Sequence, residues 1–166
     1  ILRHVPDAEV ISIPVADGGE GSVDCFLEAM GGQMVEAEVY GPLGTWMTAH
    51  YGIVSQHTAI IEMAACAGLP LVEGHQDPEK TTTFGVGQLM LDAVKRGCRK
   101  IIVGLGGSCT NDGGAGAASA CGAKFYDAEG RAFTPVGGTL NHIARVDLSG
   151  LKTQLKGIEL VAMCDI

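Results

Sequence analysis

Basic side chains are scarce in this sequence, and the few present are dispersed along it. Lys and Arg together number 11 against 19 Asp and Glu, which gives a formal net charge of −8. Only residues 95–100 form a small basic cluster. Because duplex binding needs clustered Lys and Arg to neutralise phosphates, this composition argues against a nucleic-acid partner. Small anionic substrates remain open, since main-chain N–H groups and a metal ion can supply a local positive field.

Long apolar runs are also missing. No run approaches the roughly 18 residues of a membrane-spanning helix. The start, Ile1-Leu2-Arg3-His4, leads directly into the polar Pro6-Asp7-Ala8-Glu9 and does not resemble a signal peptide. We therefore expect a cytoplasmic protein with no membrane partner.

Cysteine pairs at metal or redox spacing do not occur either. The six cysteines include no Cys-x-x-Cys pair, and most have apolar neighbours, as in Met63-Ala64-Ala65-Cys66-Ala67. This pattern predicts reduced, buried thiols and argues against a disulfide framework or a zinc site.

What is present is a globular composition with regular hydrophobic spacing. Apolar residues make up 46 % of the chain. Their periodicity predicts strands over residues 9–13, 33–40, 45–53, 58–63, 100–105, 123–126, 131–133 and 158–164. It predicts helices over residues 22–30, from Thr83 to Gly97, and over 114–121 and 139–145.

This order of elements predicts an α/β fold with a mainly parallel, Rossmann- or flavodoxin-like sheet. The strand meander that begins near residue 33 predicts a second, smaller α/β subdomain beside that sheet. We divide the chain into a first α/β region (1–32), the meander of the second subdomain (33–80) and an α/β region with a glycine-rich loop (81–166). The missing initiator Met and the strand-like end at residues 158–166 lead us to expect truncation at both ends.

The strongest chemical signal is the connection Gly104–Gly116, which has six glycines in thirteen residues between a predicted strand and a predicted helix. Glycine lets a ligand approach the main chain, and N–H groups at the start of a helix suit phosphate or carboxylate. Ligands of open α/β sheets bind beyond the carboxyl ends of strands, where this connection lies. It is neither a Walker A loop nor a GxGxxG dinucleotide loop. A tight turn with close helix packing is the alternative, although packing alone does not need the neighbouring Ser, Thr, Asn and Asp.

From this connection we predict a set of ligand contacts. The main-chain and neutral side-chain donors are Gly106, Gly107, Ser108, Thr110, Asn111, Gly113 and Gly114. Asp112 is a candidate for holding Mg²⁺ or accepting a proton.

A second candidate segment, Ala16–Gly21, also joins a predicted strand to a helix and places two acids among three glycines. Asp17 and Glu20 suit a metal–phosphate site or a general base acting on a hydroxyl. Glu20 also fits the simpler role of an acid favoured by the helix dipole. Gly18 and Gly19 are predicted to let the ligand approach.

Two further segments leave alternatives open. Glu62 ends an apolar strand, where a carboxylate is costly unless it is functional or paired, for example with an Arg. The run Thr81-Thr82-Thr83 either caps the following helix or binds phosphate or carboxylate, with Thr83 as the ligand candidate.

Together these segments resemble the bacterial glycerate kinase family over essentially the whole chain. The most specific match is Gly106–Gly114, a Gly-Gly-Ser-x-Thr-Asn-Asp-Gly-Gly run in which Cys109 fills a position that is commonly Ala. The other matching stretches are residues 13–21, 41–44, 60–64, 81–85, 147–151 and 164–165. The family's initial Pro-Asp-Ser-Phe-Lys motif and its later Gly-Pro-Gln-Lys-Gly-like segment are absent. We therefore expect this chain to be less than half of an enzyme and inactive alone.

The resemblance implies a transferase of glycerate metabolism, in which D-glycerate and ATP meet between two α/β domains. It implies ATP and Mg²⁺ as cofactors and phosphorylation at the 2-hydroxyl to give 2-phosphoglycerate, although a 3-phosphate product is annotated for some members. The partner it implies is the small-molecule substrate, and a homodimer is one assembly that stays open.

The expected mechanism relies on positioning and on offsetting charge. The 106–114 connection holds an anionic group, and Asp17 or Asp112 accepts the proton of the attacking hydroxyl. The other carboxylate serves Mg²⁺ with Glu20 or Asp165.

Two other classes of protein remain open: a different small-molecule kinase or phosphate-binding enzyme, and a non-catalytic hydroxy-acid or nucleotide-binding domain. Acids clustered within glycine-rich loops favour an enzyme, since a simple anion binder would avoid them.

Overall fold

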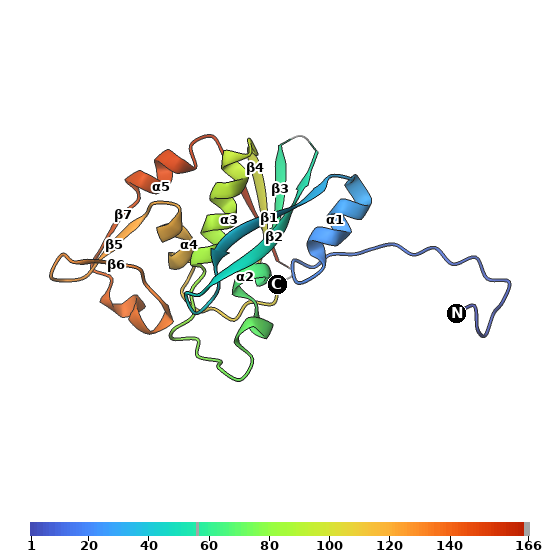
Figure 1. Cartoon of the computed structure of the whole chain (residues 1–166), viewed down its shortest axis with the longest axis horizontal. Helices are drawn as coiled ribbons and strands as arrows, with labels where there is room; N and C mark the ends of the chain where they lie inside the picture. Colours follow the sequence, from blue (N-terminus) through green and yellow to red (C-terminus); the bar gives the residue numbers. More distant parts are fainter. Residues whose placement is uncertain (56, 165–166) are drawn as a thin grey trace.

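The structure is a computed structural model that describes residues 1–55 and 57–164. Its N-terminal segment extends away from the body of the molecule (Figure 1). The strand predicted over residues 9–13 is not formed, and Val10, Ile11 and Ile13 are exposed. A strand needs a partner for its main-chain groups, and the described residues supply none here.

The chain then builds a central sheet whose first half is antiparallel. Helix α1 (Ser22–Met30) ends where the Gly31 N–H donates to the Leu27 carbonyl. Strands β1 (Gln33–Tyr40), β2 (Trp46–Val54) and β3 (Thr58–Glu62) follow, and each pairs antiparallel with the next. The predicted helix and three strands are therefore confirmed to within one residue at most ends.

The second half of the sheet is parallel. Strand β3 pairs with β4 (Lys100–Gly104), and β4 pairs with β8 (Glu159–Met163), so the order is β1-β2-β3-β4-β8. A short helix α2 (Ala64–Ala67), a 3₁₀ turn (Leu69–Val72) and helix α3 (Phe84–Lys95) connect β3 to β4. Because both of these pairs are parallel, the carboxyl ends of β3, β4 and β8 lie at the same end of the sheet.

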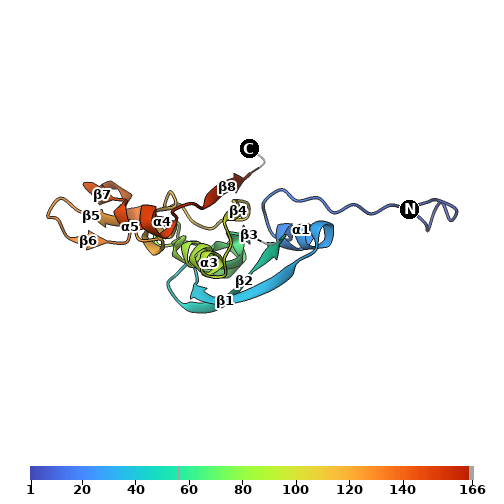
Figure 2. The same cartoon turned by 90° about the horizontal axis from the view of Figure 1, so that it is seen from above.

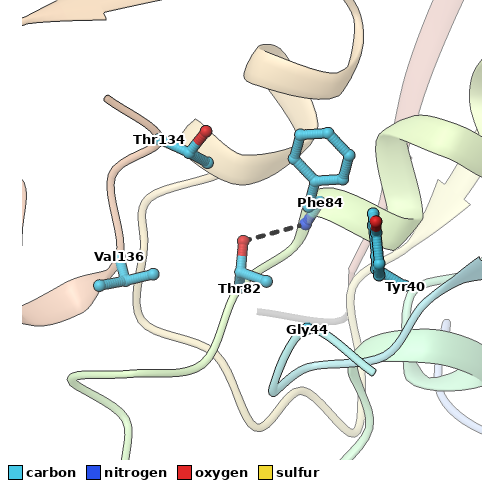
Figure 3. Close-up of a pocket in the computed structure, with 6 residues that line it drawn as sticks. All are labelled: Tyr40, Gly44, Thr82, Phe84, Thr134 and Val136. Carbon is cyan, nitrogen blue, oxygen red and sulfur yellow. Dashed lines mark hydrogen bonds between the residues drawn. The ribbon is translucent and has the colours of Figure 1, made fainter. Parts of the chain in front are cut away.

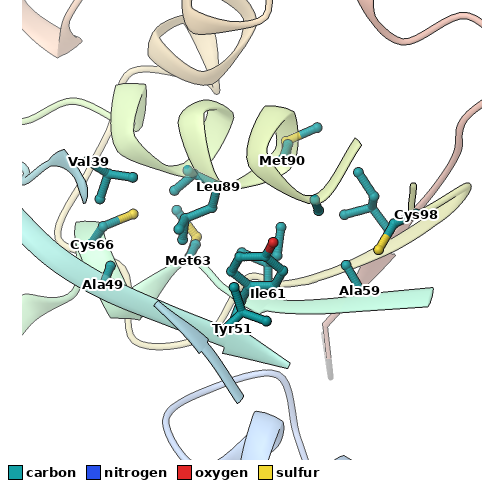
Figure 4. Close-up of a cluster of buried hydrophobic side chains, with 14 of the residues drawn as sticks. Val39, Ala49, Tyr51, Ala59, Ile61, Met63, Cys66, Leu89, Met90 and Cys98 are labelled. Carbon is teal, nitrogen blue, oxygen red and sulfur yellow. The ribbon is translucent and has the colours of Figure 1, made fainter. Parts of the chain in front are cut away.

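Helix α3 covers one face of this sheet and forms the main hydrophobic core with it (Figure 4). Tyr51, Ile61 and Leu89 are fully buried there. The Tyr51 hydroxyl donates to the Asp92 carboxylate at 2.9 Å, so the one polar atom of this side chain has a partner on α3. On the opposite face, Val23 of α1 packs with Val54 and Ile60 in a smaller cluster.

A smaller antiparallel sheet lies at the end of the molecule away from the N-terminal segment (Figures 1 and 2). Its strands are β5 (Lys124–Tyr126), β6 (Ala132–Phe133) and β7 (Arg145–Asp147), in the order β6-β5-β7. Helices α4 (Ala115–Ala120) and α5 (Ser149–Gln154) flank it in the chain. The helix predicted over residues 139–145 is wrong, because a 3₁₀ turn (Gly137–His142) ends before β7, which pairs with β5.

The fold class is confirmed: an α/β protein with a central sheet that contains parallel strands and a smaller second sheet. The meander strands β1 and β2, however, belong to the central sheet, because β2 pairs with β3 along its second edge. The second sheet is formed instead by residues 124–147. The division into regions 1–32, 33–80 and 81–166 stays a prediction.

Candidate functional site

Three chain segments meet at the carboxyl ends of the parallel strands. The Gly106 N–H donates to the Gly18 carbonyl at 3.0 Å, which joins the connection after β4 to the segment before α1. The Leu105 N–H donates to Met163 at the end of β8, also at 3.0 Å. The two glycine-rich segments of the sequence are thus neighbours, at the edge of the sheet where open α/β proteins bind ligands.

Close main-chain packing explains part of the glycine content. A Cβ placed on Gly106 would lie 2.7 Å from both the Cα and the N atom of Gly19. Any larger residue would push the two connections apart. The packing alternative considered for these glycines therefore holds for Gly106.

Glu20 lies over the next residue of the same loop. Gly107 has a φ of +71°, a left-handed conformation that favours glycine. A Cβ on it would lie 2.6 Å from a carboxylate oxygen of Glu20. Glu20 is exposed and precedes the first turn of α1, so its charge faces the junction between the two loops.

Asp17 is the second exposed carboxylate at this junction. It accepts a hydrogen bond from the Gly19 N–H at 2.9 Å, which turns the chain toward α1. Gly18 and Gly19 are buried, and the Gly18 N–H donates to the Ser22 hydroxyl. These two glycines therefore shape the turn, while the acids on either side of them reach solvent.

The connection after β4 leaves several of its main-chain donors unused. Cys109 N–H donates to Ala67, and Thr110 N–H donates to the Ser108 hydroxyl, which also contacts the Thr110 hydroxyl at 2.9 Å. Within residues 1–55 and 57–164, no hydrogen bond is donated by four other main-chain N–H groups: those of Gly107, Ser108, Asn111 and Gly113. Unpaired N–H groups of this kind suit an anionic ligand.

Asp112 differs from the two exposed acids because it is only 1 % exposed. Its carboxylate accepts hydrogen bonds from Thr83 N–H at 2.8 Å and from Gly114 N–H at 2.9 Å. It also accepts from Gly116 N–H at 3.1 Å and from the Thr83 hydroxyl at 2.9 Å. Asp112 therefore holds the protein main chain together at the start of α4.

The three threonines before α3 bind protein atoms. Thr81 hydroxyl donates to the Cys109 carbonyl at 2.9 Å, and Thr83 hydroxyl accepts from Ala117 N–H at 2.9 Å. Thr83 occupies the N-cap position, but its side chain makes no capping bond, so the simple capping hypothesis is wrong for this residue. Thr82 lies one residue before the N-cap, and its hydroxyl accepts from Phe84 N–H at 3.2 Å.

Glu62 also has a main-chain partner. Its carboxylate accepts from Val23 N–H in the first turn of α1 at 2.6 Å, in place of the arginine considered from the sequence. Burial raises the pKa of this carboxyl, with smaller contributions from Asp24 and Glu20, while the Val23 hydrogen bond lowers it. The start of α1 is therefore occupied by an internal carboxylate.

Exposed carboxylates are the groups of this junction that could meet a divalent cation. Residues 1–55 and 57–164 contain no cluster of three or more His, Cys, Asp or Glu placed to hold a metal. Mg²⁺ usually binds through one or two carboxylates and takes its other oxygens from water and substrate phosphates. The exposed Asp17 and Glu20 fit that requirement, whereas Asp165 lies outside the described residues.

A cavity of about 290 Å³ opens beside the start of α3 (Figure 3). It is lined by Tyr40, Gly44, Thr82, Phe84, Thr134 and Val136. The ring centroids of Tyr40 and Phe84 are 5.9 Å apart in an edge-to-face arrangement. Sequence reasoning missed this cavity, because its walls come from three segments that only the fold brings together.

The part of the chain that the structure describes has no helix that is both long and apolar enough to cross a bilayer.

The fold and this junction define a class: α/β proteins with glycine-rich loops at the carboxyl ends of parallel strands. Comparison with known proteins is more specific, since the profile of the Glycerate kinase family matches residues 1–166. The chain belongs to the glycerate kinase family.

Individual relatives agree with this membership. The chain is 47 % identical to the glycerate 2-kinase of Escherichia coli (strain K12) and 45 % identical to a glycerate kinase of Bacillus cereus, each over 97 % of its length. It also matches the crystal structure of a candidate glycerate kinase 2 from Salmonella typhimurium LT2, with a TM-score of 0.87 and 43 % identity over 99 % of this chain. The chain spans only 43 % of the first two relatives and 45 % of the crystallised one.

Proposed function

We propose that the protein containing this chain transfers the γ-phosphate of ATP to D-glycerate. The observation that carries the proposal is the junction of two glycine-rich connections: one has main-chain N–H groups unpaired among the described residues, and the other has two exposed carboxylates, of which Glu20 lies against Gly107. Phosphoryl transfer needs both features, because the donors offset phosphate charge and the acids serve a proton and a metal ion. Membership of the glycerate kinase family, and relatives named glycerate kinase, support D-glycerate as the substrate.

The anion would bind along the connection after β4. We assign its contacts to the main-chain N–H groups of Gly107, Ser108, Asn111 and Gly113 and to the side chains of Ser108, Thr110 and Asn111. Gly106 and Gly114 use their N–H groups within the protein, so their proposed part is to let the main chain turn closely. Gly18 and Gly19 have the same part on the opposite connection.

Asp17 is our candidate for the group that accepts the proton of the attacking hydroxyl. It is exposed at the junction, and its carboxylate accepts one hydrogen bond from the described residues, which leaves acceptor capacity. Asp112 is less suited to this role, because protein donors already surround its buried carboxylate. A general base contributes about 10²–10⁴-fold to a rate.

Glu20, together with Asp165, is our candidate for holding Mg²⁺. A bound Mg²⁺ would offset phosphate charge and orient the transferred group. Transfer to the 2-hydroxyl, giving 2-phosphoglycerate, is the proposed outcome, since one relative is named glycerate 2-kinase.

The direct test uses the protein that carries this chain at its natural length. It is incubated with ATP, Mg²⁺ and D-glycerate, and the product is identified by ³¹P NMR, which distinguishes the 2-phosphate from the 3-phosphate. We expect 2-phosphoglycerate. Absence of any phosphorylated glycerate would contradict the proposal, and a 3-phosphate product would contradict the proposed position of transfer.

The role of Asp17 is tested by Asp17→Asn, which keeps the shape of the side chain and removes its basicity. We expect kcat to fall by about 10²–10⁴-fold with a much smaller change in KM. Asp24→Asn is the matched control, because Asp24 is an exposed acid in the first turn of α1 and outside the junction. Full turnover by Asp17→Asn would remove Asp17 from the mechanism.

A further inference from the structure

We propose that Asp112 and Thr83 are positioning residues that hold the glycine-rich connection in the shape that receives the ligand, without touching the transferred group themselves. The kinetic part of this inference rests on the proposed function. The conformational part does not, because it concerns the connection in the absence of any ligand. The inference also gives a role to the one buried acid of the segment.

Protein donors surround the Asp112 carboxylate on both of its oxygens. One oxygen, Oδ1, accepts from Gly114 N–H at 2.9 Å and lies 3.1 Å from the Thr83 hydroxyl. The other, Oδ2, accepts from Thr83 N–H at 2.8 Å, Gly116 N–H at 3.1 Å and the Thr83 hydroxyl at 2.9 Å. The Thr82 hydroxyl is a further neighbour of Oδ2 at 3.4 Å. With the side chain 1 % exposed, no substrate hydroxyl can reach these oxygens without breaking bonds that already exist.

Thr83 joins the starts of two helices. It is 4 % exposed, and its hydroxyl donates to Asp112 while it accepts from Ala117 N–H of α4 at 2.9 Å. The seam is tight, since a Cβ on Gly116 would lie 2.7 Å from both Asp112 Oδ2 and Phe84 N. The starts of α3 and α4 are therefore fixed to each other through this pair of side chains.

The threonine run before α3 anchors the glycine-rich connection at two points. The Thr81 hydroxyl, which is fully buried, donates to the Cys109 carbonyl at 2.9 Å. Thr83 and Asp112 form the second anchor, three residues farther along the connection. Thr110 and Asn111, which we assign to ligand binding, lie between the anchors. Fixing such groups before the ligand arrives lowers the entropy that binding must overcome.

The chemistry of the pair explains why a carboxylate is suited to this position. All of its neighbours donate hydrogen, so an acceptor with two oxygens satisfies them. An amide at residue 112 would turn an NH₂ group toward at least one N–H donor. A valine at residue 83 would keep the side-chain shape but leave Ala117 N–H and Asp112 each without one partner.

The experiment compares Asp112→Asn, Thr83→Val and Thr83→Ser in the protein at its natural length. Thr153→Val is the matched control, because the Thr153 hydroxyl donates to the Ser149 carbonyl on an exposed helix away from the site. Two measurements are made: amide hydrogen exchange of residues 107–114 without ligand, and steady-state kinetics with ATP and D-glycerate as a function of pH. Thr83→Ser is the milder variant if either of the others fails to fold.

If the inference is correct, Asp112→Asn and Thr83→Val both speed exchange of residues 107–114. Both raise KM for the substrate that binds this connection, ATP or D-glycerate, by about 10- to 100-fold, with the pH dependence of kcat unchanged. Thr83→Ser restores wild-type values, and Thr153→Val leaves both measurements unchanged. The double variant should cost much less than the product of the single effects, since both changes break one arrangement.

Two results would overturn the inference. One is that Asp112→Asn abolishes kcat with normal loop exchange while Thr83→Val behaves as wild type, which would make Asp112 the proton acceptor. The other is that both variants lower only the melting temperature and leave loop exchange and KM unchanged. If the wild-type protein does not phosphorylate glycerate, the proposed function fails, and the exchange measurement still decides the inference.

Discussion

Four acidic side chains that the sequence marks as candidate site residues have different environments in the folded protein. Asp17 and Glu20 are exposed at the junction of two loops, whereas Asp112 and Glu62 are buried. Asp112 is surrounded by donors from α3 and α4, and Glu62 is bound to the start of α1. The chemistry available to each acid therefore depends on its neighbours, and only the exposed pair is placed to meet a ligand.

Glu62 gives a stability prediction with a definite dependence on pH. Its pKa in the folded protein lies above the ordinary value of 4.5, chiefly because of burial. The folded state therefore binds a proton on Glu62 more tightly than the unfolded state does. The stability that this protonation contributes is complete below about pH 4.5 and is lost as the pH rises through the folded-state pKa. Glu62→Gln keeps an acceptor for Val23 N–H but does not titrate. Its stability relative to wild type should rise over the same pH range and then level off.

The measurement for Glu62 is urea unfolding of both proteins between pH 4 and pH 8. A constant difference over that range would contradict the prediction. Glu62→Ala is the comparison that removes the acceptor, and it should cost about 1–3 kcal/mol because the buried Val23 N–H loses its partner.

At the scale of elements, the site depends on two connections that approach each other at main-chain distance. The hydrogen bond from Gly106 N–H to Gly18 and the packing of Gly106 on Gly19 hold them together. Both contacts are between main-chain atoms, so a residue larger than glycine at position 106 would push the two connections apart. The glycine pattern therefore has two causes here, close packing at Gly106 and the left-handed turn at Gly107.

Gly106→Ala tests the need for this close approach. Its methyl group would meet main-chain atoms of Gly19 at 2.7 Å, which cannot move aside as a side chain can. We expect a loss of about 1–3 kcal/mol of stability, as for other overpacked sites, and a large loss of kinase activity. Gly130→Ala is the control: it lies in the turn between β5 and β6 with open space around it, so it should lose stability through its φ of +79° but keep activity. Wild-type activity in Gly106→Ala would show that the loops can separate without harm.

At the scale of the whole molecule, one continuous sheet sets the position of the site. The antiparallel strands β1 and β2 extend the parallel strands, and α3 seals the core against them. The carboxyl ends of β3, β4 and β8 then lie together, and the connections that follow β3 and β4 lie side by side. The segment that follows β6 of the smaller sheet contributes one wall of the cavity in Figure 3 through Thr134 and Val136.

The cysteines provide a test of this packing. Cys66, Cys98 and Cys121 are buried, and burial raises the pKa of the Cys66 thiol to about 12 and that of Cys121 to about 11. Because the thiolate is the reactive form, these three should resist a thiol reagent at pH 8 and react only as fast as the protein unfolds. Exposed Cys164 should be modified first.

Peptide mass spectrometry after timed labelling checks the order of modification. Labelling in denaturant is the control, because all six thiols should then react. Rapid modification of Cys66 in the native protein would contradict the core described for Figure 4.

The sequence by itself determined the local elements and the chemical composition of the site. Helix α1 and strands β1–β4 and β8 follow from hydrophobic periodicity and from glycines at their ends, which act over a few residues of chain. The dense glycines of residues 104–116 and the two acids of residues 16–21 were likewise evident as candidate ligand-binding segments. The roles assigned to their individual residues remain predictions.

Only the tertiary structure decided which partners these residues have. Residues 9–13 have a strand pattern but no neighbouring strand in the part of the chain that the structure describes, and residues 145–147 form β7 because β5 lies beside them. Asp112 binds Thr83 across 29 positions of sequence, and Glu62 binds Val23 across 39. Such contacts depend on how the chain returns to the same place in space, and the spacing of residues along a single sequence does not contain that information.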